Sequence, residues 1–419
     1  MNFKVLTVGC KVNQYESQAV REYFLSNGLV EVLTGPADLY LINTCTVTQQ
    51  ADSKSLKLIR RSRKQNPKAR LVVTGCLAET DREKIKKAGA DLVITQSKKP
   101  DLFSFLNPQK PSPNDIWSFR VKNFARNRAF VKAQDGCNNF CSFCKVRIVR
   151  GGSKSRPLRE VLEEIERLAD CGFREIVLCG INLGSWRIGK MSFADLLEKA
   201  LQIKSLGRIR LSSMQPQYID ARLLALMANS QKLCPHLHLP FQSGSDKILK
   251  LMNKKVSSRF YFDLISEIRK ILPDCGLSCD LMVGFGPEDA EDFRKTLRLL
   301  RESQAVRSHI FTYSPRGTTD LASLSGSGSA ILKKRAFQAS CVAKEVSFQF
   351  RKSQENKIFK IVFDSNLNDP KMLGYSESYI RVLVKAFKNE PLIRDPRRFY
   401  RARIRSTDFN YSYAEIEKP

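Results

Sequence analysis

The sequence Cys137-Asn-Asn-Phe-Cys141-Ser-Phe-Cys144 places three cysteines in the spacing C-x3-C-x2-C. This spacing offers three thiols to one site and no obvious fourth. A structural zinc site uses four protein ligands, whereas a 4Fe–4S cluster held by three thiolates keeps one iron free for another ligand. The pattern therefore favours an iron–sulfur cluster. A zinc knuckle with a distant fourth ligand is the alternative.

The cysteine loop lies between an apolar run, residues 129–133, and a helix pattern that begins near Leu158. A loop in such a position can hold reactive groups on a rigid scaffold. The loop resembles the signature of the radical S-adenosylmethionine (SAM) enzymes. This resemblance implies that the open iron binds the amino and carboxylate groups of SAM.

The composition indicates a multidomain protein with an anionic partner. The chain has 419 residues, of which 42% are hydrophobic, and this suits two or three globular domains. The chain lacks an apolar run of about 18 residues and begins with a strand pattern, so we expect a cytoplasmic protein without a membrane partner. Its twelve cysteines then read as metal ligands and core thiols rather than disulfides. The formal net charge of +29 favours nucleic acid over an anionic membrane surface as the partner.

Three apolar strand patterns near the N-terminus alternate with helix patterns, the first of them at about residues 16–26, which predicts a parallel α/β sheet. Each is followed at once by a cysteine: Cys10, Cys45 and Cys76 follow residues 3–9, 38–44 and 70–75. Because parallel sheets bind ligands at the carboxyl ends of their strands, we expect these thiolates to converge. Their convergence predicts a second iron–sulfur cluster, with three unrelated buried cysteines as the alternative.

The segments around these cysteines read Gly9-Cys10-Lys-Val-Asn-Gln-Tyr-Glu-Ser17, Asn43-Thr44-Cys45-Thr-Val-Thr48 and Thr74-Gly75-Cys76. They resemble the N-terminal domain of the tRNA and ribosomal-protein methylthiotransferases. The first segment is most similar to the branch that acts on threonylcarbamoyladenosine in tRNA. The isopentenyladenosine branch and the ribosomal-protein branch usually differ after the first Gly-Cys.

A Pro-, Ser- and Lys-rich stretch, residues 107–123, reads as a linker, and helix and strand patterns alternate after it. Six such units fit the open (β/α)6 partial barrel of radical SAM enzymes, whose working residues lie at strand carboxyl ends. The resemblance implies four SAM-binding residues: Gly180 and Asn182 near the methionine portion, Ser212 and Gln242 near the ribose. All three histidines fall on strand patterns, which favours packed or hydrogen-bonded roles: His236, His238 and His309.

From Lys357 onward the pattern changes to four short strands, at residues 358–363, 379–386, 399–406 and 411–416, which predicts a small all-β module. The module resembles the TRAM domain, an OB-like barrel of RNA-modifying enzymes. Its arginines are interleaved with aromatic residues, which suits phosphate contact and base stacking, although a solvated barrel surface would read similarly. The expected RNA contacts are Arg381, Arg397, Arg398 and Arg401. A basic helix pattern at residues 51–65 is either a further phosphate contact or a solvated face.

We therefore expect three domains: residues 1–107 with the auxiliary cluster, residues 123–355 with the radical SAM barrel, and residues 356–419 with the TRAM barrel. The resemblance implies a tRNA methylthiotransferase that converts threonylcarbamoyladenosine next to the anticodon to its 2-methylthio derivative. It also implies SAM and two 4Fe–4S clusters as cofactors. Cys137, Cys141 and Cys144 would hold the cluster that cleaves SAM, and Cys10, Cys45 and Cys76 the cluster that supplies or carries sulfur.

The implied partners are tRNA, an electron donor and a sulfur source. Two alternatives lie within the same family, namely the isopentenyladenosine branch and the ribosomal-protein branch. A third alternative, of another class, is a zinc-bearing RNA-binding protein without catalysis. Iron, sulfide and zinc analysis of anaerobically purified protein would separate the last alternative from the others.

Overall fold

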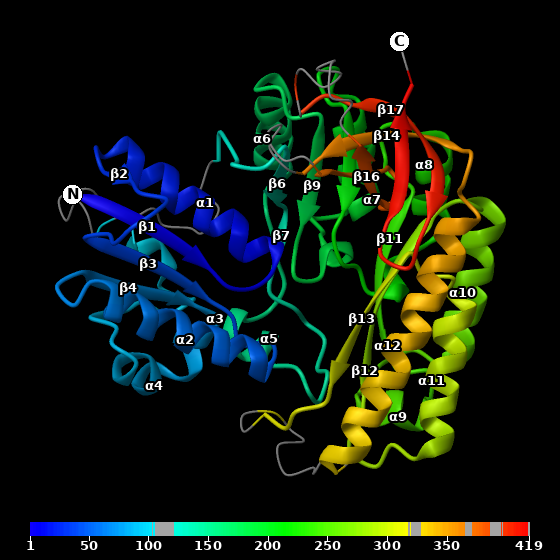
Figure 1. The fold of residues 1–419 in the computed structure, drawn as a ribbon, viewed down its shortest axis with the longest axis horizontal. Coiled ribbons are helices and arrows are strands. Elements are labelled where there is room, and N and C mark those ends of the chain that lie inside the picture. The colour runs from blue at the N-terminus through cyan, green and yellow to red at the C-terminus, as the bar shows by residue number, and fades with distance from the viewer. Residues whose placement is uncertain are drawn as a thin grey trace. The chain divides into compact units, whose positions relative to one another are not determined.

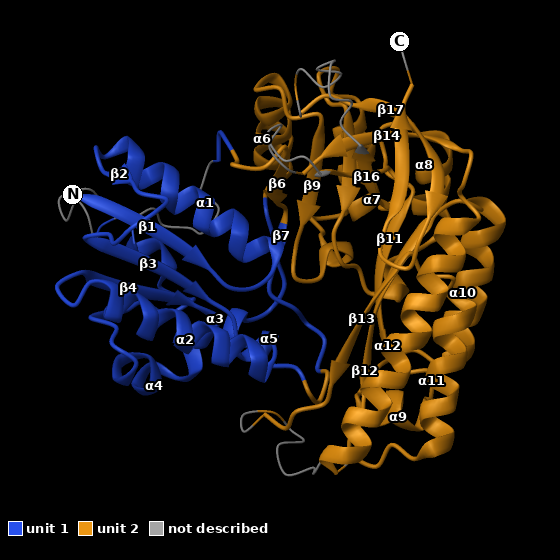
Figure 2. Ribbon diagram, viewed as in Figure 1, with its two compact units in different colours: residues 1–123, 134–140, 144–156 blue, residues 124–133, 141–143, 157–419 orange. Residues whose placement is uncertain are grey.

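The computed structural model describes residues 1–102, 104, 121–316, 319, 328–364, 371–385, 395 and 397–417. Residue contacts divide the chain into two units (Figure 2). Unit 1 comprises residues 1–123, 134–140 and 144–156, and unit 2 comprises residues 124–133, 141–143 and 157–419. The expected linker, residues 107–123, lies outside the described residues except for 121–123. The bounds of the three expected domains stay predictions.

Unit 1 is built on a parallel sheet with the strand order β2-β1-β3-β4-β5 (Figure 1). Its strands are β1 (Asn2–Thr7), β2 (Val30–Glu31), β3 (Leu39–Thr44), β4 (Arg70–Gly75) and β5 (Leu92–Val93). The order reverses between β1 and β3, and the carboxyl ends at such a switch point flank the ligand crevice of doubly wound sheets. The N-terminal parallel α/β fold expected from the sequence is confirmed.

Helices cover both faces of this sheet. On one face, Phe3 of β1 packs edge to face against Phe24 of α1, with ring centroids 5.2 Å apart. On the other face, Ile59 and Ile85 pack into the core beneath β3 and β4. The helices of unit 1 are α1 (Lys11–Ser26), α2 (Gln49–Gln65), α3 (Cys76–Thr80), α4 (Arg82–Lys87) and α5 (Val146–Arg150). A short antiparallel pair, β7 (Gln134–Asp135) and β8 (Lys154–Ser155), completes the unit.

Helix α1 begins earlier than the pattern predicted, at Lys11 rather than near Glu16. Gly9 has a φ of +121°, which ends the preceding strand and lets the helix start directly behind Cys10. Helix α2 begins where a hydroxyl cap is available, because Thr48 Oγ1 accepts a hydrogen bond of 3.1 Å from the amide of Ala51.

Unit 2 contains six parallel strands in chain order around a partial barrel (Figure 1). They are β6 (Arg128–Lys132), β9 (Glu175–Cys179), β10 (Arg208–Leu211), β11 (His236–Gln242), β12 (Gly276–Val283) and β13 (Arg307–Thr312). Between β10 and β11 the ladder is reduced to isolated parallel bridges, Ile209 to Leu233 and Ser213 to His238. This architecture confirms the expected radical SAM type of barrel.

The helices of unit 2 follow the strands. They are α6 (Leu158–Asp170), α7 (Phe193–Leu201), α8 (Ala221–Asn229), α9 (Asp246–Leu251), α10 (Ser258–Ile271), α11 (Ala290–Glu302) and α12 (Ser329–Lys352). Along β12 the buried residues Leu277, Cys279 and Leu281 alternate with residues of the opposite face, among them Asp280. No helix among the described residues is long and apolar enough to cross a membrane.

The C-terminal strands close into a small barrel of order β14-β15-β16-β18-β17, which confirms the expected all-β module. They are β14 (Ile358–Phe363), β15 (Lys371–Tyr375), β16 (Arg381–Lys385), β17 (Tyr400–Thr407) and β18 (Ser412–Ile416). Strand β15 was not predicted, because five residues with Gly374 near the end carry little alternation. It completes the barrel by pairing with both β14 and β16.

A buried ion network fastens this small barrel to the strands of unit 2. Glu175 accepts hydrogen bonds of 2.6 and 2.8 Å from Arg208 and Arg210. The same two guanidinium groups donate to the backbone carbonyls of Tyr375, at 3.2 Å, and Ser376, at 2.8 Å. Burial opposes ionisation of Glu175, but Arg210 and Arg208 hold its pKa well below the usual range. The small barrel is therefore a fixed part of unit 2.

Candidate active site

Three cysteines lie at one edge of the unit 1 sheet. Cys10 follows β1 at the start of α1, Cys45 follows β3, and Cys76 opens α3 directly after β4. These strands are neighbours in the sheet. The thiols of Cys76 and Cys10 both lie close enough to raise the pKa of Cys45, and Cys10 likewise raises the pKa of Cys76. The structure thus brings together the three cysteines that sequence spacing alone leaves 35 and 31 residues apart.

Two glycines make this approach possible. Gly75, directly before Cys76, has a φ of +100°, and a Cβ there would lie 2.3 Å from the carbonyl oxygen of Thr44. A Cβ on Gly9 would lie 2.9 Å from the Cβ of Cys45. Both positions therefore require glycine, for backbone conformation and for space. The Gly-Cys pairs are what allow the strand ends to place their sulfurs side by side.

Buried charges surround the cysteine edge. Arg150, from α5, donates to Asp135 at 2.9 and 3.0 Å and to Glu16 at 3.1 Å. Its second nitrogen donates to Asn13 Oδ1 at 2.5 Å. The ammonium of Lys99 lies 2.5 Å from Glu16. Two cations thus face two carboxylates inside the unit, which keeps the local charge balanced before any thiolate is counted.

These cations also act on the thiols. Burial raises the pKa of Cys45 to about 12 and raises that of Cys76, whereas Arg150 and Lys99 act to lower the pKa of Cys76. Such thiols stay protonated in the free protein, and a metal centre must displace their protons on binding. The neighbouring cations reduce the electrostatic cost of the resulting thiolates.

The number of thiols separates a cluster from a structural zinc ion. A structural zinc site uses four protein ligands, whereas the strand ends offer the three thiols of Cys10, Cys45 and Cys76. A 4Fe–4S cluster held by three thiolates keeps one iron open to another ligand. The donors therefore fit a 4Fe–4S cluster better than structural zinc.

The C-x3-C-x2-C loop provides backbone hydrogen bonds to its own sulfur atoms. Backbone amides donate to two of its thiols, Asn139 to Cys137 at 3.4 Å and Val146 to Cys144 at 3.5 Å. Hydrogen bonds of this kind stabilise cluster-bound thiolates and tune their potential. The boundary between the units passes through this loop, with Cys137 and Cys144 in unit 1 and Cys141 in unit 2.

Conformation and packing hold the two parts of the loop. In unit 1, Gly136 has a φ of +69°, and a Cβ there would lie 2.0 Å from the carbonyl oxygen of Gly152. In unit 2, Ser142 Oγ donates to the carbonyl of Leu251 at 2.7 Å. The Phe143 ring packs against Phe285 at 6.2 Å. Each part of the loop is thus held within its own unit.

The four residues expected to bind SAM all lie at the carboxyl ends of barrel strands. Gly180 follows β9 and Ser212 follows β10, and the Gly180 amide donates to Ser212 Oγ at 3.4 Å. Asn182 is buried just beyond Gly180. Gln242 ends β11 with a φ of +71°. Residues other than glycine rarely adopt this backbone conformation, and such strained residues are often found at binding sites. Their contact with SAM stays a prediction.

The four arginines expected to bind RNA differ in their surroundings. Arg381 is exposed and its guanidinium lies 4.9 Å from the Tyr411 ring centre. Arg398 and Arg401 keep 73% and 68% of their side chains exposed, with weak ion pairs of 3.6 and 3.4 Å. Arg397 instead lies over the Phe173 ring at 4.2 Å. Arg397 and Arg381 thus each lie over an aromatic ring, whereas Arg398 and Arg401 form ion pairs.

Sequence reasoning missed the buried charges around the auxiliary cysteines. Arg150 and Lys99 are two of 71 basic residues, and nothing in the local pattern separates them from solvated ones. A usable signal lay in α1, where Asn13 and Glu16 occupy the helix face that would otherwise bury apolar side chains against the sheet. Polar residues on a buried face require partners, and those partners are Arg150 and Lys99.

Two family descriptions match the chain. The uncharacterized protein family UPF0004 matches residues 2–95, and the radical SAM superfamily matches residues 131–300. A solved radical SAM methyltransferase, TsrM from Kitasatospora setae, has a TM-score of 0.58 and 13% identity, and the match covers 77% of each chain. At that identity the likeness concerns the fold alone.

Relatives of two names cover most of the chain. The threonylcarbamoyladenosine tRNA methylthiotransferase MtaB of Chlamydia pneumoniae is 39% identical over 76% of this chain and 76% of its own length. The MtaB of Bacillus subtilis is 32% identical over 90% of this chain and 89% of its own. A tRNA-2-methylthio-N(6)-dimethylallyladenosine synthase of Endomicrobium trichonymphae is 34% identical over 77% of this chain and 79% of its own.

Proposed function

The chain belongs to the radical SAM methylthiotransferase family, and from this premise we propose that it is a tRNA methylthiotransferase. Its substrate is threonylcarbamoyladenosine next to the anticodon, which it converts to the 2-methylthio derivative. The observation that carries this proposal is the pair of cysteine triads, one in the loop of residues 137–144 and one at three neighbouring strand ends. The MtaB relatives are named for this activity.

SAM and two 4Fe–4S clusters are the cofactors. The loop thiolates Cys137, Cys141 and Cys144 hold one cluster, and Cys10, Cys45 and Cys76 hold the other. When bound, these groups supply the radical chemistry and the sulfur handling that protein side chains lack. The protein holds the thiolates in place, buries Cys45 and Cys76 of the auxiliary triad, and offsets the charge of these two with Arg150 and Lys99. Gly180, Asn182, Ser212 and Gln242 bind SAM at the strand ends.

The small C-terminal barrel presents tRNA to the larger barrel of unit 2. Its attachment through Glu175, Arg208 and Arg210 makes it a rigid platform, so a bound tRNA has a defined position relative to the parallel strands. Arg381, Arg398 and Arg401 contact phosphate there. Helix α2 adds a second basic surface in unit 1, with five exposed cations: Lys54, Lys57, Arg60, Arg61 and Lys64.

The dimethylallyladenosine (isopentenyladenosine) branch is the second candidate, because relatives of that name are 32–34% identical to this chain. The segment from Gly9 to Ser17 favours the threonylcarbamoyl branch. The reaction also needs an electron donor and a sulfur source, and we place it in the cytoplasm, where tRNA is available. A zinc-bearing protein without catalysis is disfavoured because each triad offers three thiols, whereas a structural zinc site uses four protein ligands.

Two cysteine variants of the reconstituted full-length protein test this function. With dithionite, SAM and tRNA, Cys141→Ala should abolish formation of 5′-deoxyadenosine and of every later product. Cys76→Ala should still form 5′-deoxyadenosine but no methylthio nucleoside. Iron should fall by about half in each, since each triad binds one of two clusters. Methylthiolation at the wild-type rate by Cys76→Ala would refute a sulfur-handling role for the N-terminal triad.

A further inference from the structure

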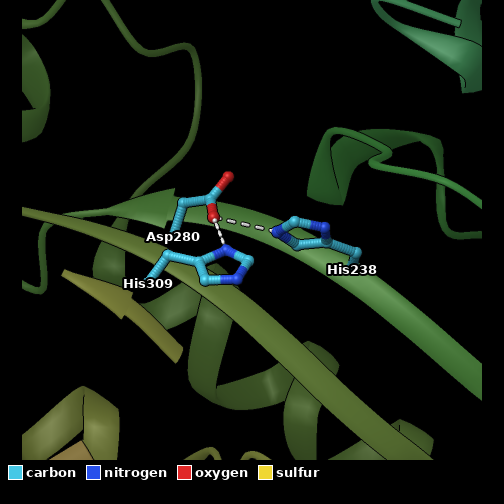
Figure 3. A group of neighbouring side chains, drawn as sticks. All are labelled: His238, Asp280 and His309. Atoms are coloured by element: carbon cyan, nitrogen blue, oxygen red, sulfur yellow. Dashed lines mark hydrogen bonds and ion pairs between the residues drawn. The ribbon is translucent and has the colours of Figure 1, made fainter. Parts of the chain in front are cut away.

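A second group of side chains that can ligate a metal ion lies in the barrel of unit 2. His238 of β11, Asp280 of β12 and His309 of β13 come from three neighbouring strands and meet on one face (Figure 3). His238 Nε2 and His309 Nδ1 each lie 2.9 Å from the same carboxylate oxygen, Oδ1 of Asp280. Among the described residues, this is the one group whose three donor atoms all lie within 4.8 Å of one another.

The surroundings of this group differ from those of an ordinary buried hydrogen-bond network. The side chains of His238, Asp280 and His309 keep 16%, 18% and 37% of their surface exposed, so an ion or water can reach them. Within the described part of the chain, Asp280 forms ion pairs with these histidines and with no lysine or arginine. A largely enclosed carboxylate thus has two imidazoles as its partners, and a cation between the three groups would compensate its charge.

The third histidine provides the contrast. His236 lies two residues earlier on the same strand, is 3% exposed, and its Nε2 lies 2.9 Å from Ser278 Oγ. Its ring also packs at a tilt against the Tyr379 ring, with centroids 4.4 Å apart. His236 therefore shows what a histidine with a structural role looks like in this barrel, and His238 and His309 depart from it.

We propose that His238, Asp280 and His309 form a binding site for one divalent transition-metal ion, separate from the cysteine clusters. Two imidazoles and one carboxylate are a ligand set for Mn, Fe, Co or Zn ions, and it leaves coordination positions open. Bonds of about 2.0–2.2 Å place neighbouring donors roughly 3.0–3.5 Å apart, so separations of 2.9 Å need only a small outward movement. Because the site lacks a thiolate, it favours a harder ion than the cysteine triads do.

Manganese is the probe that tests this site, because Mn²⁺ has little affinity for the remaining free thiols. Full-length protein with both clusters reconstituted and oxidised is titrated with Mn²⁺ alone, and free Mn²⁺ is followed by electron paramagnetic resonance. We expect one equivalent to bind. Asp280→Asn and His309→Gln should each weaken binding at least tenfold, since each removes a ligand. The matched control His236→Gln should leave the affinity unchanged.

Circular dichroism and cluster content establish that each variant is folded, and two separate ligand variants keep the test decisive if one of them fails to fold. The absence of a stoichiometric Mn²⁺ site at millimolar concentration would overturn the proposal. Unchanged binding in a folded Asp280→Asn or His309→Gln protein would overturn it as well. In either case the three residues form a hydrogen-bonded group only.

Discussion

Replacing Arg150 tests whether buried charge holds the auxiliary cysteine edge together. Arg150→Gln removes a guanidinium that is 1% exposed and contacts both Glu16 and Asp135. Breaking a buried ion pair by removing one partner costs about 3–5 kcal/mol. Glu16 keeps Lys99 as a cationic partner, so the cost arises mainly at Asp135. We therefore expect unit 1 to lose about 3–5 kcal/mol of stability.

Native-state hydrogen exchange of the full-length protein measures this loss directly. The amides of β3 and β4 should lose about two to three and a half powers of ten in protection, at about 1.4 kcal/mol per power of ten. The amides of β11 and β12 in unit 2 serve as an internal control. The double variant Arg150→Gln with Asp135→Asn removes the orphaned charge and should recover much of the protection. A loss of stability below about 1 kcal/mol in the single variant would refute this reasoning, because an ordinary solvent-exposed ion pair already contributes up to that amount.

Two further variants probe the cysteine edge and the RNA surface. Gly75→Ala would place a Cβ 2.3 Å from the Thr44 oxygen and should prevent assembly of the auxiliary cluster, measured as iron per chain. The matched control is Gly28→Ala, at a residue with a φ of +81° and open space around it, which should keep its iron. Equal iron in both would show that close packing at Gly75 is unimportant. Neutralising the three exposed arginines should flatten the salt dependence of tRNA binding by roughly one log–log unit for each phosphate that they neutralise. Those arginines are Arg381, Arg398 and Arg401; an unchanged slope would identify them as a solvated face.

Local patterns were enough to predict the architecture because each layer of this fold has a local signature. Alternating strand and helix patterns predicted both parallel units, and the cysteines that follow strand ends predicted where the auxiliary thiols would meet. The small barrel was predicted with four of its strands, whereas β15 was missed because it is short and ends near Gly374. Its position depends on pairing with β14 and β16, and no local pattern encodes pairing of this kind.

The electrostatic part of the site could not be predicted in the same way. Arg150 and Glu16 are 134 residues apart in the chain, and their contact depends on the tertiary fold. Likewise, the expected RNA-binding arginines look alike in sequence, but Arg397 packs on Phe173 while Arg398 remains exposed. The fate of a charged side chain depends on what surrounds it in three dimensions, and a strongly basic chain offers too many candidates.

The most direct test of the central claim is mass spectrometry of tRNA nucleosides from cells with and without this protein. Loss of the protein should remove 2-methylthio-threonylcarbamoyladenosine, with threonylcarbamoyladenosine left in its place. The 2-methylthio derivative of isopentenyladenosine should be unaffected, and a Cys76→Ala copy should fail to restore the missing nucleoside. Loss of the isopentenyl derivative instead, or an unchanged set of methylthio nucleosides, would contradict the proposed function.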